Sequence, residues 1–156
     1  MGSLLLDNQL CFALYAASRA VTQRYRPLLD ELGLTYPQYL VMLVLWEREP
    51  AAIGDLATAL ELDHGTLSPL LKRLETAGLL TRRRRSDDER VVDIELTPAG
   101  RELRERAAAV PQVIVDSYDV DAGQFDSLRS QLRQLTKSVA AASEGAGDAD
   151  PAPGME

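Results

Sequence analysis

The chain has 156 residues, 46% of them hydrophobic, so it is long enough to bury one core. Its formal net charge of −7 argues against a protein that binds nucleic acid over its whole surface. The longest apolar run, residues 39–46, is far shorter than the ~20 residues that cross a bilayer, and no cationic export signal precedes it. A single cysteine cannot form an intrachain disulfide, so we expect a cytoplasmic protein without a membrane partner.

Two helices are predicted before Pro50. The first should be capped by Asp7 or Asn8 and end near Leu32, because its apolar residues recur every three or four positions (Leu10, Leu14, Ala17, Val21, Tyr25 and Leu28). Thr35 and Gln38 then have the spacing of a capping box, which predicts the start of a second helix.

Residues 53–97 have the pattern of a helix-turn-helix followed by a hairpin. A short helix over residues 53–60 precedes a break, after which Asp63 can cap a second helix. One face of that second helix is apolar (Leu67, Leu70, Leu71 and Leu74). Its other face carries small, hydrogen-bonding or cationic residues (His64, Gly65, Ser68, Lys72 and Thr76). Such a helix can enter the major groove of DNA.

The hairpin is predicted from two alternating segments, residues 80–85 and 90–96, after a helix stop at Gly78. Residues 72–90 hold seven cations against four acids, although the whole chain is acidic. Phosphate binding depends on the electrostatic field within about 8 Å, so the local excess of cations, and not the net charge of the chain, determines whether this region can bind DNA. We therefore predict a DNA-binding winged helix; arginines that only solvate a hairpin are the alternative.

A long helix is expected from Thr97-Pro98, kinked at Pro111, with one apolar face (Leu103, Ala107, Val110, Ile114 and Tyr118). Asp121 should cap a last helix with a short coiled-coil-like seam (Phe125, Leu128, Leu132, Leu135 and Val139). From Ser143 onward we expect a disordered acidic tail.

The predicted fold class is mainly α (α+β), a winged helix-turn-helix with flanking long helices. We divide the chain into N-terminal dimerisation and sensing helices (1–52), the winged region (53–97), C-terminal dimerisation helices (98–142) and the tail (143–156). The terminal helices predict a homodimer that reads a palindromic operator, unless they only enlarge a monomer core.

This order of elements over roughly residues 4–142 resembles the MarR family of bacterial transcriptional regulators. Residues 6–15 (LDNQLCFALY), 32–39 (LGLTYPQY) and 65–74 (GTLSPLLKRL) resemble its organic hydroperoxide resistance subfamily, OhrR, of the one-cysteine type. The resemblance implies that Cys11 senses peroxide and that Tyr25 and Tyr36 reach it from the other subunit. It also implies that Arg90 enters the minor groove, oriented by Asp88. The full set of predicted DNA contacts is His64, Gly65, Thr66, Ser68, Pro69, Lys72, Arg73, Arg83, Asp88 and Arg90.

The surroundings of Cys11 agree with a sensing thiol. Free N–H groups near a helix start stabilise a thiolate, and apolar neighbours such as Phe12 suit an organic peroxide. Oxidation would give a sulfenic acid, which a low-molecular-weight thiol caps or further oxidation traps, and the operator would be released. One alternative is a repressor released by a small aromatic or acidic ligand, with Cys11 structural. The other is a thiol peroxidase, which the absence of a resolving cysteine disfavours. We expect no enzyme, cofactor or metal, since the only histidine, His64, has no companion ligands.

Overall fold

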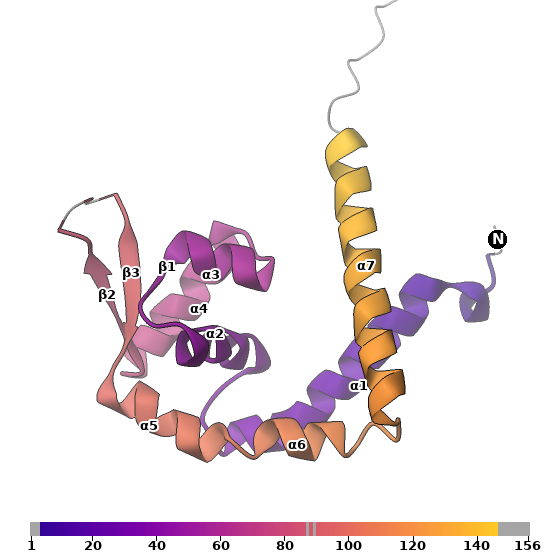
Figure 1. Ribbon diagram of the computed structural model, residues 1–156, viewed down its shortest axis with the longest axis horizontal. Coiled ribbons are helices and arrows are strands. Elements are labelled where there is room, and N and C mark those ends of the chain that lie inside the picture. The colour runs from indigo at the N-terminus through magenta and orange to yellow at the C-terminus, as the bar shows by residue number, and fades with distance from the viewer. Residues whose placement is uncertain (1–3, 87, 89, 147–156) are drawn as a thin grey trace, which may run out of the picture. The chain divides into compact units, whose positions relative to one another are not determined.

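Helix α2 (Tyr36–Glu47) is the central element of the first of two units, Met1–Asp116 and Ser117–Glu156 (Figure 1). The computed structural model describes residues 4–86, 88 and 90–146. Half of α2 is buried, on several of its sides (Gln38, Tyr39, Val41, Met42, Val44 and Leu45). A helix that is apolar nearly all round can only be stable inside a core. Accordingly, α2 contacts α1, α3, α4, α5 and β3.

Helix α1 (Leu10–Asp30) begins later than predicted. Asp7 and Asn8 lie in a separate 3₁₀ turn, η1 (Leu6–Asn8), so the predicted cap at either residue is wrong. The N-cap is Gln9, whose backbone is extended and whose side chain makes no capping bond. The turn ends because Gln9 N–H donates to the Leu6 carbonyl and the backbone then straightens. Cys11 is therefore the second residue of α1, in its first turn.

The predicted helix-turn-helix is confirmed. Helix α3 (Ile53–Leu60) leads to α4 (His64–Thr76), and the Asp63 side chain accepts a hydrogen bond from Thr66 N–H at 2.8 Å. The capping box at α2 is present as well, with Thr35 N–H donating to Gln38 Oε1 at 2.8 Å. The leucines of α4 that face inward are buried (Leu67, Leu71 and Leu74).

Strands β2 (Leu80–Arg84) and β3 (Val92–Leu96) form the predicted hairpin, paired from Leu80 opposite Leu96 to Arg84 opposite Val92. A further strand, β1 (Ala51–Ala52), pairs with β3 and completes an antiparallel sheet of order β1-β3-β2. Two alanines are too short for an alternating pattern, so the sequence did not predict β1. The winged-helix fold class is confirmed.

The single kinked helix predicted after the wing is wrong. Helix α5 (Pro98–Ala107) ends before α6 (Val110–Val115), and Pro111 occupies the second position of α6. Proline has no N–H to donate to the Ala107 carbonyl, so α5 ends there. Pro111 then lies in the first turn of α6, where a backbone N–H has no partner within the helix and its absence costs nothing. The predicted apolar face is nevertheless buried (Leu103, Ala107, Val110 and Ile114).

The second unit contains α7 (Ala122–Ala146). Asp121 caps it as predicted, because Gln124 N–H donates to the Asp121 carboxylate at 2.9 Å and Asp121 N–H donates to Gln124 Oε1 at 3.1 Å. Tyr118 stacks on Phe125 at 6.0 Å in this unit and is not part of α6. Residues 143–146 are helical, which corrects the predicted start of the tail; residues 147–156 lie outside the described residues.

Candidate nucleic-acid interface and thiol site

The outer face of α4 presents the predicted contact residues to solvent. All of them are exposed (His64, Gly65, Thr66, Ser68, Pro69, Lys72 and Arg73). The Thr66 hydroxyl donates to the Asp63 carboxylate at 2.8 Å, and this bond is the main reason why the pKa of Asp63 lies below its ordinary value. The cap therefore orders the first turn of α4, the part that a recognition helix presents to base edges.

Three of the wing arginines are held by carboxylates. Arg85 donates to both carboxylate oxygens of Asp93, at 2.7 and 2.9 Å, and these bonds lower the pKa of Asp93. Arg82 pairs with Glu75 of α4 at 3.3 Å and also donates to the Ser68 carbonyl, which fixes the wing against the helix. Arg83 lies 3.8 Å from Glu95 with 76% of its side chain exposed, so this pair is weak.

Four other cations of α4 and the wing are exposed and make no ion pair with a described residue: Lys72, Arg73, Arg84 and Arg90. The Asp88 carboxylate accepts the Arg90 backbone N–H at 3.1 Å, which fixes the turn that carries Arg90. Arg84 was not among the predicted contacts. It stands opposite Val92, so the strand register places no acid directly across from it.

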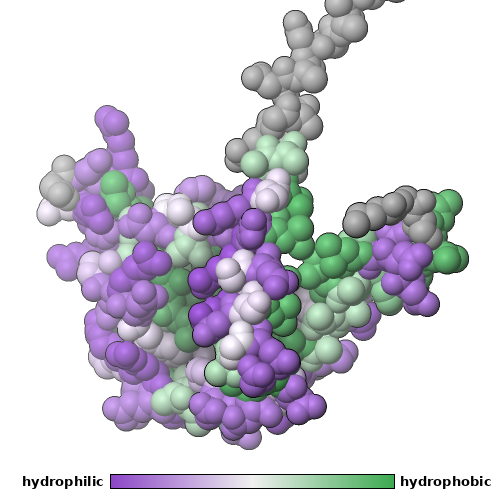
Figure 2. Space-filling model, turned by 45° about the vertical axis from the view of Figure 1, so that its right-hand side comes forward, coloured by the Kyte–Doolittle hydropathy of each residue, from purple (hydrophilic) through white to green (hydrophobic). Residues whose placement is uncertain are grey.

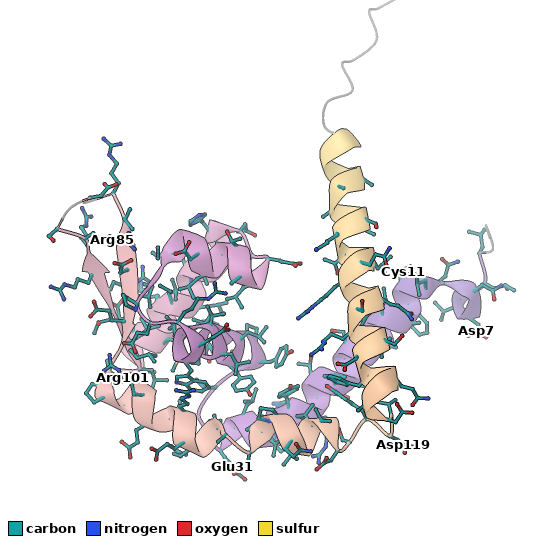
Figure 3. All side chains as sticks on the ribbon, in the orientation of Figure 1. Asp7, Cys11, Glu31, Arg85, Arg101 and Asp119 are labelled. Atoms are coloured by element: carbon teal, nitrogen blue, oxygen red, sulfur yellow. The ribbon has the colours of Figure 1, made fainter. Side chains whose placement is uncertain are left out.

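Cys11 is exposed at the N-terminal end of α1 (Figure 3). Its apolar neighbours are exposed too: Leu10 by 62%, Phe12 by 40% and Tyr15 by 58%. Apolar side chains around a thiol make a surface on which an organic peroxide can lie, provided that a further element covers them. No cluster of three or more metal-ligating side chains occurs in the described part of the chain.

Tyr25 and Tyr36 pack against each other, with ring centroids 4.8 Å apart, and Tyr39 lies 5.9 Å from Tyr25. Burial raises the pKa of Tyr36 and of Tyr39, so their hydroxyls stay protonated near neutral pH. Tyr25 follows Cys11 on the same helix by a rise of about 21 Å, so the thiol and these rings do not meet within one chain. Their meeting across a dimer stays a prediction. Tyr39 was not predicted, although its spacing from Tyr36 places both on one helix face.

Residues 23–106 match the family described as "Transcriptional regulator SarA/Rot". The chain is also 46% identical to the organic hydroperoxide resistance transcriptional regulator of Bacillus subtilis (strain 168), over 86% of this chain and 91% of that protein. The chain belongs to the MarR/SarA family of transcriptional regulators. The resemblance found in the sequence motifs is thereby confirmed.

Solved structures similar to this MarR/SarA family regulator include two of AbfR on DNA. Reduced AbfR bound to DNA superposes with a TM-score of 0.74 at 36% identity, covering 87% of this chain and 93% of that one. Overoxidized AbfR bound to DNA gives 0.67 at 40% identity, covering 84% and 95%. In the described residues of this regulator, no helix has the length and apolar content needed to cross a membrane.

Proposed function

We propose that this regulator is a homodimeric DNA-binding repressor that releases its operator when an organic hydroperoxide oxidises Cys11. The observation that carries this proposal is the exposed thiol in the first turn of α1, next in sequence to Leu10 and Phe12, whose apolar side chains are also exposed. The choice of an organic hydroperoxide as oxidant is supported by a relative that is named for organic hydroperoxide resistance. A cysteine that served only to fill a core would be buried.

Exposed apolar side chains at the start of the chain support a dimer. Leu4, Leu5 and Leu6 are 103%, 67% and 57% exposed, and Figure 2 shows hydrophobic side chains gathered at this end of α1. In the other unit, the seam of α7 is exposed at Leu128 and Val139. Water contact with so many large apolar groups is unfavourable, so a second subunit that covers them is stabilising. We assign residues 1–52 and 98–142 to this dimerisation role.

DNA binding is assigned to α4 and the wing. The exposed face of α4 offers the residue types that contact bases and phosphates, and Arg84 and Arg90 extend the cationic surface onto the hairpin. Two such surfaces related by a two-fold axis would read a palindrome with half-sites about one helical turn apart. Arg90 is assigned to the minor groove, on the turn that the Asp88 carboxylate fixes.

The proposed redox step consumes one peroxide for each thiol. The Cys11 sulfur attacks the outer peroxide oxygen, the O–O bond breaks, and the products are Cys11 sulfenic acid and the alcohol. A small thiol then condenses with the sulfenic acid to give a mixed disulfide and water. Overoxidized AbfR has been solved bound to DNA, so overoxidation is compatible with DNA binding in that protein. We therefore propose the mixed disulfide as the releasing state here.

A gel shift with operator DNA tests this function. Cumene hydroperoxide together with a small thiol should release the wild-type protein, while mass spectrometry shows one thiol adduct per chain. Peroxide alone should release it less. The Cys11→Ser variant should bind DNA when untreated and remain bound in both treatments.

Release of Cys11→Ser by peroxide would exclude sensing through sulfur. Release by a small aromatic acid, with the thiol intact, would point to a ligand-controlled repressor instead. Sustained consumption of peroxide over many turnovers would point to an enzyme.

A further inference from the structure

Helix α2 is a single rigid element with a proposed sensor residue, Tyr36, at its start. Its other end lies near the base of the wing. Tyr36 is its first residue, and Trp46 lies in its last turn. Twelve residues of α-helix span about 18 Å, and this helix is packed on several sides, so it moves as one body. A shift imposed at Tyr36 must therefore appear at Trp46.

At the wing end, Trp46 holds the start of α5. Its indole N–H donates to the Gly100 carbonyl at 2.9 Å. Gly100 packs directly on the residue before β2, because a Cβ built on it would overlap the Leu79 carbonyl oxygen. The same Leu79 oxygen accepts the Thr97 N–H at 3.1 Å. Whatever moves Gly100 therefore moves the start of β2.

Glu49 makes a second attachment just after α2. Its carboxylate accepts the Leu96 N–H at the end of β3, at 2.8 Å, and Arg101 Nε donates to it at 3.1 Å. Arg101 lies where the wing meets α5 (Figure 3). Two side chains near the end of α2 thus hold the final residue of β3 and the first turn of α5.

A continuous row of rings leads from α1 to these attachments. Tyr25 of α1 contacts Tyr36 and Tyr39 of α2, and the Tyr39 ring lies 6.2 Å from Trp46 in an edge-on arrangement. Close-packed rings cannot be compressed, so displacement of one ring displaces the next.

We propose that Trp46 and Glu49 are the positioning residues that couple oxidation of Cys11 to the orientation of the wing. This inference rests on the proposed function, since it names how that site reaches the DNA-binding surface. Neither residue touches the thiol or the exposed face of α4. Their role is to make the wing follow α2.

A second connection could carry the same signal without α2. Arg106 of α5 donates to the Glu31 carbonyl at the end of α1, at 2.7 Å. This bond also joins a side chain to a backbone carbonyl, and it bypasses Trp46. Arg106 therefore provides a matched control for the route through α2.

Trp46 can report on its own surroundings, because it is the only tryptophan in the chain. Peroxide with a small thiol should change the emission maximum or intensity of the intact protein, in proportion to the fraction of Cys11 modified. The Cys11→Ser variant should show no change. Emission that stays constant while operator affinity falls would overturn the proposed route.

The decisive measurement is a coupling factor, the ratio of operator dissociation constants after and before oxidation. Trp46→Phe keeps an aromatic ring and removes the donor. The indole borders an open groove of about 520 Å³, so the smaller ring leaves no sealed cavity. Loss of one hydrogen bond between moving parts should lower the coupling factor about 2- to 10-fold. The Arg106→Met control should keep the wild-type factor.

Glu49→Gln is the second variant. It keeps an acceptor for the Leu96 N–H and loses the charge that pairs with Arg101, so it should also lower the coupling factor. It tests the inference even if Trp46→Phe fails to fold. A merely structural role would change both dissociation constants equally and leave the factor at its wild-type value, which would overturn the inference. A wild-type factor of one would instead overturn the proposed function itself.

Discussion

The winged region and the first turn of α1 belong to one chain but differ in what surrounds them. Leu71 of α4 and Ile94 of β3 are fully buried, and the Glu49 side chain, just after α2, accepts the backbone N–H of the last residue of β3. Around Cys11, in contrast, Leu6 and Leu10 are more than half exposed. The proposed DNA-binding surface is thus completed by contacts within its own chain, whereas the proposed thiol site requires a further surface to cover it.

The largest effect should come from the buried side of α4. Leu71→Ala should lower the free energy of unfolding by about 2–5 kcal/mol, because it removes a fully buried side chain and leaves a cavity. Urea denaturation followed by circular dichroism measures this loss. The neighbouring exposed Lys72→Ala is the control, with a change of at most about 0.5 kcal/mol. Equal losses in both variants would contradict the burial of this face.

A substitution at the start of α1 should act on assembly of the proposed dimer. Leu10→Ser removes an apolar side chain that is 62% exposed in one chain, so it should leave the fold of the subunit intact. Burial of a leucine contributes about 1.5–3 kcal/mol, so the dimer dissociation constant should rise by about tenfold or more. Sedimentation equilibrium measures that constant. A wild-type protein that is monomeric at micromolar concentration would contradict the proposal that a second subunit covers the start of α1.

Arg90→Ala should distinguish cations that reach phosphate from those that are held by acids. Each phosphate contact removed should lower the slope of log K against log salt by about 0.9, so a dimer that loses one contact in each subunit should lose about 1.8. Arg85→Ala should change the slope less, because its guanidinium already contacts both oxygens of Asp93. Operator binding titrated at several salt concentrations gives both slopes. Equal slopes for Arg90→Ala and wild type would show that Arg90 does not contact the DNA.

The smallest effect concerns the cap of α4. Hydrogen bonds from Thr66 hold the pKa of Asp63 below its unfolded value of about 3.9, so the stabilisation is present above about pH 4. It is lost as the pH falls through the folded pKa. Asp63→Asn also caps a helix but does not titrate. The stability difference between wild type and this variant, measured in urea, should therefore shrink below about pH 4. A difference independent of pH would show that the charge of the cap is irrelevant.

Local patterns determined most of the elements. Helical spacing, the cap at Asp63 and strand alternation depend on residues close in sequence, so α3, α4 and the hairpin follow from the chain alone. The start of α1 did not, because Asp7 can cap a helix or enter a 3₁₀ turn, and local preference does not choose between them. The division at Pro111 was foreseen as a kink, since the pattern shows the missing donor but not how far the helix axis breaks.

The sequence by itself determined the family and the single thiol, and it predicted which helix reads DNA, because each depends on residues that are neighbours in the chain. Only the tertiary structure decided which wing arginines are held by acids, since Arg82 meets Glu75 of α4 and Arg85 meets Asp93 of the neighbouring strand. It also decided that Trp46 reaches Gly100 and that Glu49 reaches Leu96, contacts between residues some fifty positions apart. Such contacts form where elements pack, and no local spacing encodes them.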